Sequence, residues 1–125
     1  MMIGMLDLEM SRVDGYAMIA AAGSLKTADD SDTLSAAMSF VPVDDHLVID
    51  LRRVERISLA CARSLCGQLL ERVAWAEAVV VTDQPDVTVQ LVLGDVDRVA
   101  PVVASVPQAI QVITARSGFD ATEVA

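Results

Sequence analysis

The stretch from Leu47 to Cys61 decides the fold, and it reads LVIDLRRVERISLAC. It begins with the continuous apolar run Leu47-Val48-Ile49, which is typical of an interior strand of a parallel sheet. We expect this strand to end at Asp50 and to be followed by a loop rich in arginine. A helix is predicted from Leu59 to Val73, because apolar side chains recur along it at helical spacing. The stretch therefore predicts a strand, a loop and a helix in succession.

Two strands are predicted before this unit. Apolar and polar residues alternate from Leu6 to Arg12, as in a strand that is half buried, and Asp14-Gly15 is typical of a tight hairpin turn. The run from Tyr16 to Ala22 is almost wholly apolar, which predicts a strand covered on both faces. We expect this second strand to end at Gly23 and to lie antiparallel to the first.

Further helices and a strand are predicted on both sides of the central unit. Thr27 and Asp30 have the spacing of a helix-capping pair, and the helix that they begin is stopped by Pro42. After the central helix, the apolar run Ala78–Val81 predicts another strand. The helix that follows is expected from Pro85 until Gly94.

The last predicted elements are a short strand and a helix. The strand covers Val99 to Val103, and Pro101 within it indicates the edge of a sheet. Ser105 and Gln108 have the spacing of a second capping pair, which begins the last helix. We expect the chain after Gly118 to be loose.

This order of elements predicts an α/β sandwich. Its sheet is expected to be mostly parallel, with four to five strands, an antiparallel strand at the N-terminal end and about four helices. A chain of 125 residues has room for one domain, whose core we place at about residues 6–116.

The composition excludes several classes of function. Hydrophobic residues make up 54% of the chain but aromatic residues only 3%, so the core must be aliphatic. Eighteen acidic and nine basic residues give a net charge of -9, which repels nucleic acid and anionic membranes. The apolar start, Met1 to Met10, contains acidic residues, and no apolar stretch approaches the ~20 residues of a membrane span. We therefore predict a cytoplasmic protein.

The residues that could carry metal or catalytic chemistry are few. Cys61 and Cys66 are five positions apart in one predicted helix, so we expect two buried free thiols that point to different sides. His46 is the sole histidine, and Asp44-Asp45-His46 is typical of a polar turn rather than a metal or acid–base site. We expect no metal, no cofactor and no enzyme activity.

Several segments, taken in order, match one known family. They are Gly23-Ser24-Leu25 with Leu34 and Met38, Val48-Ile49-Asp50-Leu51, Leu91, Leu93 and Gly94 in the segment from Pro85 to Val99, and Pro107 to Ile110. Together they resemble the STAS domain, the fold of bacterial anti-sigma factor antagonists, from about Leu6 to Arg116. The resemblance implies a module that docks on an anti-sigma factor of the serine-kinase type.

The phosphorylated segment of the family is altered in this chain. The family carries Asp-Ser-Ser-Gly at the start of the central helix, and here the matching residues are Ser58-Leu59-Ala60-Cys61. The kinase-type anti-sigma factor phosphorylates the second serine, whose place is taken by Ala60, so the resemblance implies that the usual switch is absent. Ser58 stays open as an acceptor, although serine at a helix start is more often a plain N-cap. Ser64, one turn further along, is a weaker candidate.

We predict that the partner-binding surface joins the turn from Gly23 to Lys26 with the central loop and helix start. Its candidate residues are Gly23, Ser24, Arg52, Arg53, Arg56, Ser58, Leu59, Ala60 and Arg63. Two alternatives stay open. The arginines could bind a small anion or nucleotide, although solvated arginines that pair with Glu55 or Glu71 are the simpler interpretation. The chain could also be a non-switching scaffold or homo-oligomer subunit of the stressosome kind, with an exposed Leu59 in a self-association patch.

Overall fold

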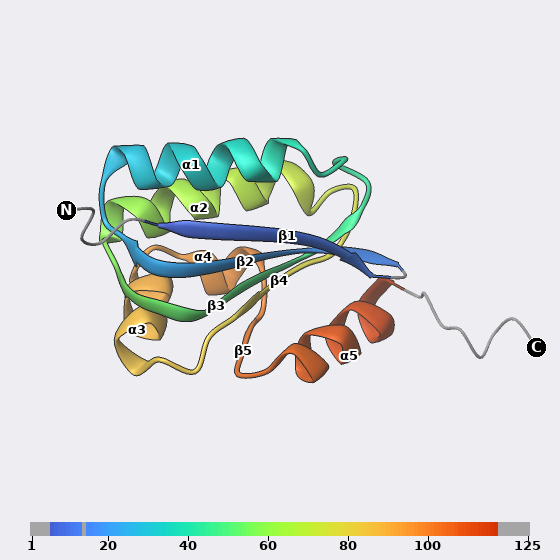
Figure 1. Ribbon diagram of the computed structural model, residues 1–125. Coiled ribbons are helices and arrows are strands. Elements are labelled where there is room, and N and C mark those ends of the chain that lie inside the picture. The colour runs from blue at the N-terminus through green and yellow to red at the C-terminus, as the bar shows by residue number, and fades with distance from the viewer. Residues whose placement is uncertain (1–5, 14, 118–125) are drawn as a thin grey trace, which may run out of the picture.

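A computed structural model describes residues 6–13 and 15–117 as one mixed sheet with helices on both faces (Figure 1). The elements are β1 (Asp7–Val13), β2 (Tyr16–Leu25), α1 (Ala28–Ser39), β3 (His46–Ile57), α2 (Leu59–Arg72), β4 (Ala78–Val81), α3 (Pro85–Leu93), α4 (Val96–Val99), β5 (Val102–Val103) and α5 (Val106–Ser117). The strands lie in the order β1-β2-β3-β4-β5. β1 and β2 are antiparallel and the other pairs are parallel, so the predicted α/β architecture is confirmed.

Two hydrophobic clusters hold the layers together. Side chains of α1, α2, α3 and α4 pack on one face of the sheet, where Ile19, Ile49 and Leu65 are fully buried. On the other face, α5 places Ala109 and Ile113 against the valines of β3 and β4. Figure 1 shows this arrangement, with α1 and α2 above the sheet and α5 below it. Both faces of the central strands are therefore covered, which explains their continuous apolar runs.

The prediction of an arginine-rich loop after Asp50 is wrong, because β3 continues through this segment to Ile57. Its buried residues after Asp50 are Leu51, Val54 and Ile57, which recur every third position rather than every second. The pairing with β2 shows two register shifts, and at each of them β3 holds one residue more than β2. Each β-bulge shifts which residues of β3 face the core, so buried and exposed residues do not alternate with a period of two in the sequence.

The second strand is also longer than predicted. β2 continues past Gly23 to Leu25, and Gly23 has a φ of 106°, a conformation that side chains with a Cβ rarely adopt. It lies beside the second bulge, where Gly23 pairs with Val54 and Ser24 pairs with Arg56. Gly23 therefore allows the backbone conformation found beside the bulge, and it does not end the strand.

The two edges of the sheet differ in part from expectation. β5 lies at the edge, as Pro101 predicted, but has only two residues, because Val99 belongs to the short helix α4. Pro101 precedes the strand and accepts a hydrogen bond from Val80 N through its carbonyl oxygen, at 2.9 Å. At the opposite edge, the alternating burial predicted for the first strand is wrong for most of β1: Leu8 packs on the core, but Met10 is exposed.

The predicted helix starts are confirmed. Thr27 and Asp30 form a complete capping box at α1. At α5, Gln108 N donates to Ser105 Oγ at 3.3 Å, and the Gln108 side chain accepts from Ala104 N at 3.0 Å. The hairpin residue Asp14 and the predicted loose tail after Gly118 lie outside the described residues.

Cysteine, histidine and acidic side chains form neither a disulfide nor a metal site in the part of the chain that the structure describes. Cys61 and Cys66 are free, the first buried and the second half-buried. No group of three or more histidine, cysteine, aspartate or glutamate side chains among residues 6–13 and 15–117 could hold a metal ion. None of the helices described there is long and apolar enough to cross a membrane.

Candidate functional site

The structure brings together the two segments that the sequence assigned to one surface. Ser58 N donates to Leu25 O at 2.9 Å, and Cys61 Sγ donates to Thr27 O at 3.4 Å. Ser24 pairs with Arg56 across the sheet. The turn between β2 and α1 therefore lies directly beside the start of α2, as expected for the carboxyl ends of neighbouring parallel strands.

The start of α2 is held by a side-chain cap. Ser58 Oγ accepts a hydrogen bond from Cys61 N at 3.1 Å, so the plain N-cap interpretation of this serine is confirmed. Ala60 is exposed as the second residue of the helix, and its side chain is a methyl group without a hydroxyl. Leu59, which was expected to be exposed, is half-buried. The position that the resemblance aligned with the phospho-acceptor is therefore exposed and carries no hydroxyl group.

Two open hollows flank this helix start. The first, which we name the α3 hollow, has a volume of about 380 Å³ and is lined by Lys26, Arg56, Ile57, Ser58, Asp86 and Gln90. The second, the α1 hollow, has a volume of about 320 Å³, and Ala60 and Ser64 line it together with residues of α1. Lys26 lines both hollows. The surface around the α2 start is therefore recessed on each side, with a basic residue between the recesses.

Ser64 is engaged inside the α1 hollow. Ser31 Oγ donates to Ser64 Oγ at 2.8 Å, and Gln68 Nε2 donates to the same oxygen at 3.1 Å. The hydroxyl is half-buried and already accepts two hydrogen bonds. Ser64 is therefore a structural link between α1 and α2.

Arg52 forms an ion pair that the sequence analysis did not identify. Its Nε and Nη2 donate to the two carboxylate oxygens of Asp50 at 2.9 and 2.8 Å, whereas Glu55 and Glu71 had been expected as partners. Burial alone would raise the pKa of Asp50, but the hydrogen bonds and charge of Arg52 hold it below its usual value. The same hydrogen bonds raise the pKa of Arg52. The Arg52 side chain is 42% exposed, but two of its nitrogen atoms are already hydrogen-bonded to Asp50.

The other arginines of the predicted surface do not converge on one point. Arg53 lines a separate hollow of about 160 Å³ with Asp7 and Glu9, while Arg56 lines the α3 hollow. Arg63 is exposed on α2. None of these three side chains makes an ion pair or a hydrogen bond within residues 6–13 and 15–117. Their separation gives no common cradle for an anion.

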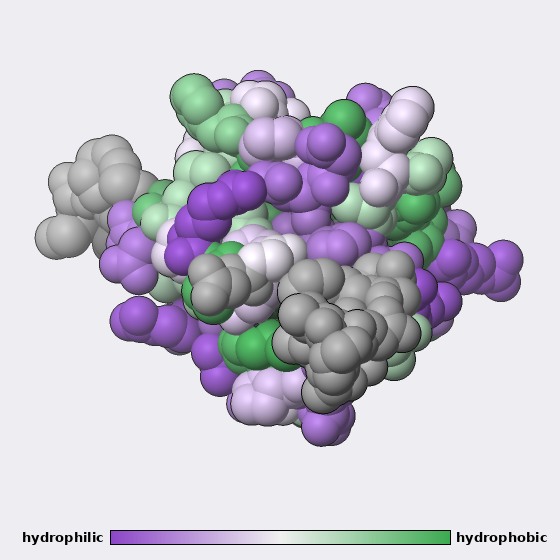
Figure 2. Space-filling model, turned by 90° about the vertical axis from the view of Figure 1, so that its right-hand side faces the viewer, coloured by the Kyte–Doolittle hydropathy of each residue, from purple (hydrophilic) through white to green (hydrophobic). Residues whose placement is uncertain are grey.

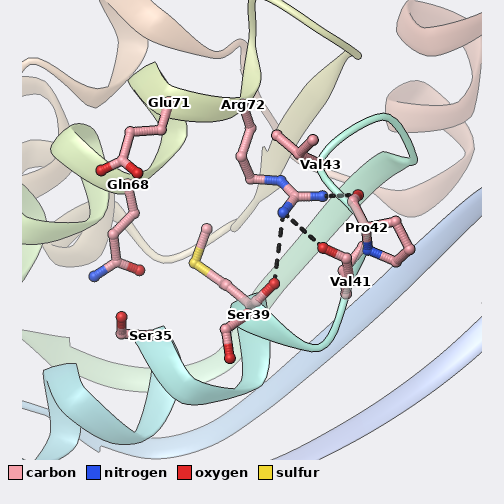
Figure 3. A pocket seen from close by; sticks show the side chains of 9 residues that line it. Ser35, Ser39, Val41, Pro42, Val43, Gln68, Glu71 and Arg72 are labelled. Atoms are coloured by element: carbon pink, nitrogen blue, oxygen red, sulfur yellow. Dashed lines mark hydrogen bonds between the residues drawn. The ribbon is translucent and has the colours of Figure 1, made fainter.

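One buried residue was missed by the sequence analysis. Arg72, in the last turn of α2, is only 8% exposed and donates to backbone oxygens of the α1–β3 connection (Figure 3). The distances are 3.0 Å to Val41 O and 2.7 Å to Pro42 O. Burial lowers the pKa of Arg72. The hollow beside it, of about 380 Å³, lies at the opposite end of α2 from Ser58.

Asp44 and Asp45 lie in a polar turn, as predicted, whereas His46 is already the first residue of β3. His46 Nδ1 accepts a hydrogen bond from Glu77 N at 3.0 Å, and Arg12 forms an ion pair with Asp45. Both contacts are structural.

Comparison with solved structures shows the fold. An anti-sigma factor antagonist from Mycobacterium paratuberculosis is similar at a TM-score of 0.75, with 19% identity over 88% of this chain and 95% of that one. A DUF3478-family protein with a SpoIIAA-like fold from Shewanella loihica PV-4 is similar at a TM-score of 0.54, with 12% identity over 86% and 93%. No protein-family model and no curated protein matches the sequence. The chain therefore has the fold of the STAS domain, as its sequence pattern predicted.

Proposed function

We propose that the chain is a regulatory binding module of the anti-sigma factor antagonist kind, which docks on an anti-sigma factor of the serine-kinase type. The docking surface consists of the β2–α1 turn, the end of β3 and the start of α2. It acts by binding and not by catalysis. The proposal is supported by the STAS-type fold and by the proximity of two segments that are about thirty residues apart in the sequence.

The single observation that carries the proposal is the exposed Ala60 at the start of α2. A phosphate at this position would add roughly two negative charges beside the partner and oppose docking. Alanine cannot accept it, so binding is constitutive. Ser58 does not replace the lost acceptor, because its hydroxyl caps the helix through Cys61 N.

The alternative functions have less support. A self-association patch centred on Leu59 is disfavoured because that side chain is half-buried. An anion or nucleotide sensor is disfavoured because Arg52 is paired with Asp50, while Arg53 and Arg56 line different hollows. We therefore assign the surface to a protein partner.

The proposal is tested by calorimetric titration of the purified chain with serine-kinase-type anti-sigma factors, with and without ATP. We expect binding to at least one of them at an affinity that ATP leaves unchanged. Ala60→Ser should restore a phosphorylatable residue, detectable by mass spectrometry, and ATP should then weaken binding. Ala74→Ser, at an exposed position beyond the end of α2, is the matched control and should behave as the wild type.

Two results would contradict the proposal. One is the absence of binding to every anti-sigma factor of this type. The other is release of the wild-type chain by ATP with phosphate on Ser58 or Ser64.

A further inference from the structure

The outer face of α3 is apolar. Val89, Val92 and Leu93 are 54%, 46% and 56% exposed, although a surface helix normally turns polar residues to solvent. The opposite side of the helix buries Val87 and Leu91 completely. No other helix or strand in the described part of the chain exposes three large aliphatic side chains.

These three side chains form one stripe. Residues three and four positions apart on a helix are neighbours, so Val89 lies between Val92 and Leu93 on the surface. The apolar residues at the end of the molecule that carries the β1–β2 hairpin are instead scattered among hydrophilic ones (Figure 2). We name Val89, Val92 and Leu93 the α3 stripe.

The α3 stripe borders the α3 hollow. Asp86 and Gln90 line that hollow, and by the same spacing they neighbour Val89 and Leu93 on the helix. Lys26 and Arg56 line the hollow from the other side. An apolar strip is thus continuous with a recess that carries basic residues.

The two basic residues are available to a partner. Lys26 and Arg56 are exposed, and neither side chain makes an ion pair or a hydrogen bond within the described residues. With Asp86 across the hollow, the lining residues carry one net positive charge in a chain whose net charge is -9. This local reversal of sign favours an acidic partner and disfavours a basic one.

We propose that the α3 stripe and the α3 hollow together bind an acidic amphipathic helix of the partner protein. Its aliphatic face covers Val89, Val92 and Leu93, and an acidic side chain at its flank pairs with Lys26 or Arg56. An apolar centre with a charged rim is the usual composition of such an interface. The inference rests on the proposed function in taking the occupant to be a protein, and it adds the face and the chemistry of the contact.

The test uses two synthetic helical peptides of about 18 residues, long enough for five turns. Both carry leucines on one face, with glutamates at the flanks of one peptide and lysines at the flanks of the other. We expect the wild-type chain to bind the glutamate peptide about tenfold more tightly in fluorescence anisotropy, and the double variant Val89→Ser/Leu93→Ser to lose about tenfold in affinity. Met10→Ser/Val13→Ser, which changes exposed apolar residues at the other end of the sheet, is the control and should bind as the wild type.

Charge reversal gives a second readout that leaves the stripe intact. Lys26→Glu/Arg56→Glu should prefer the lysine peptide, and circular dichroism should show that each variant is folded. Equal affinity of the wild type for both peptides, binding of neither, or an equal loss in the control variant would overturn the inference. So would a concentration-dependent dimer in sedimentation equilibrium that Val89→Ser/Leu93→Ser abolishes, because a second copy would then cover the stripe.

The outcomes separate this inference from the proposed function. If an anti-sigma factor binds the wild type and Val89→Ser/Leu93→Ser equally well, the inference fails and the proposed function stands. If no anti-sigma factor binds but the glutamate peptide does, the proposed function fails and the acidic helix remains the occupant.

Discussion

Replacing Arg72 by methionine tests how the α1–β3 connection is held. The guanidinium donates two short hydrogen bonds, to Val41 O at 3.0 Å and to Pro42 O at 2.7 Å. Two longer contacts of 3.5 Å, to Met38 O and Asp45 O, add little. Methionine keeps the apolar stem but leaves Val41 O without its donor, whereas Pro42 O still accepts from Asp45 N at 3.0 Å. A hydrogen bond from a charged donor contributes about 1.5 kcal/mol or more, so the two short bonds contribute about 3 kcal/mol.

The net effect is smaller because the buried charge of Arg72 also costs desolvation free energy. We expect Arg72→Met to lower the free energy of unfolding by about 2–3 kcal/mol, or the melting temperature by about 8–11 °C for a chain of this size. Urea denaturation followed by circular dichroism measures the change. Arg63→Met, at an exposed arginine of the same helix, is the control and should change stability by less than about 0.5 kcal/mol. Equal midpoints for the two variants would refute the reasoning.

Three further predictions concern stability. Gly94→Ala should destabilise the protein by about 1–3 kcal/mol in urea denaturation, because the added Cβ would lie 2.8 Å from Ala62 Cβ. Gly67→Ala should stabilise it by up to about 1 kcal/mol, because a Cβ added there meets no atom within 4 Å. Equal effects of the two substitutions would contradict this prediction. Because the pKa of Asp50 is lowered in the folded protein, its ionised carboxylate stabilises the fold at pH values above the unfolded-state pKa. This stabilisation is lost as the pH falls through the folded-state pKa. Asp50→Asn should therefore lose stability at pH 7 and show a shallower decline toward pH 3 than the wild type; parallel pH profiles would show that Asp50 does not contribute. Ser58→Ala should lower the melting temperature through a cap loss of about 1 kcal/mol, and an unchanged melting temperature would argue against the cap.

Most of the fold could be predicted because its signals are local. Helix caps such as Thr27 with Asp30 satisfy backbone donors within three residues, and an interior run such as Ala78–Val81 needs only its own composition to indicate a strand. The length of β3 could not be predicted, because its bulges are defined by the pairing with β2 and erase the alternation from Leu51 onward. The short helix α4 takes Val99, the first residue of the predicted strand from Val99 to Val103.

The candidate site could be located but not described in detail. The adjacency of the Lys26 turn and the α2 start follows from topology, since carboxyl ends of neighbouring parallel strands meet at one edge. The pairing of Arg52 with Asp50 depends on β3 continuing as a strand, which the sequence pattern concealed. Arg72 reaches carbonyl oxygens about thirty positions earlier in the chain, and no local pattern encodes such a contact. The exposed apolar side of α3 could not be predicted, because apolar residues lie on both the buried and the exposed side of this helix.

Hydrogen exchange of the chain in complex with a serine-kinase-type anti-sigma factor tests the central claim most directly. The account predicts that amides of residues 23–27 and 56–63 gain protection on binding, and that ATP leaves this protection unchanged. Protection confined to α5 or to the β1 edge, with none at the start of α2, would contradict it.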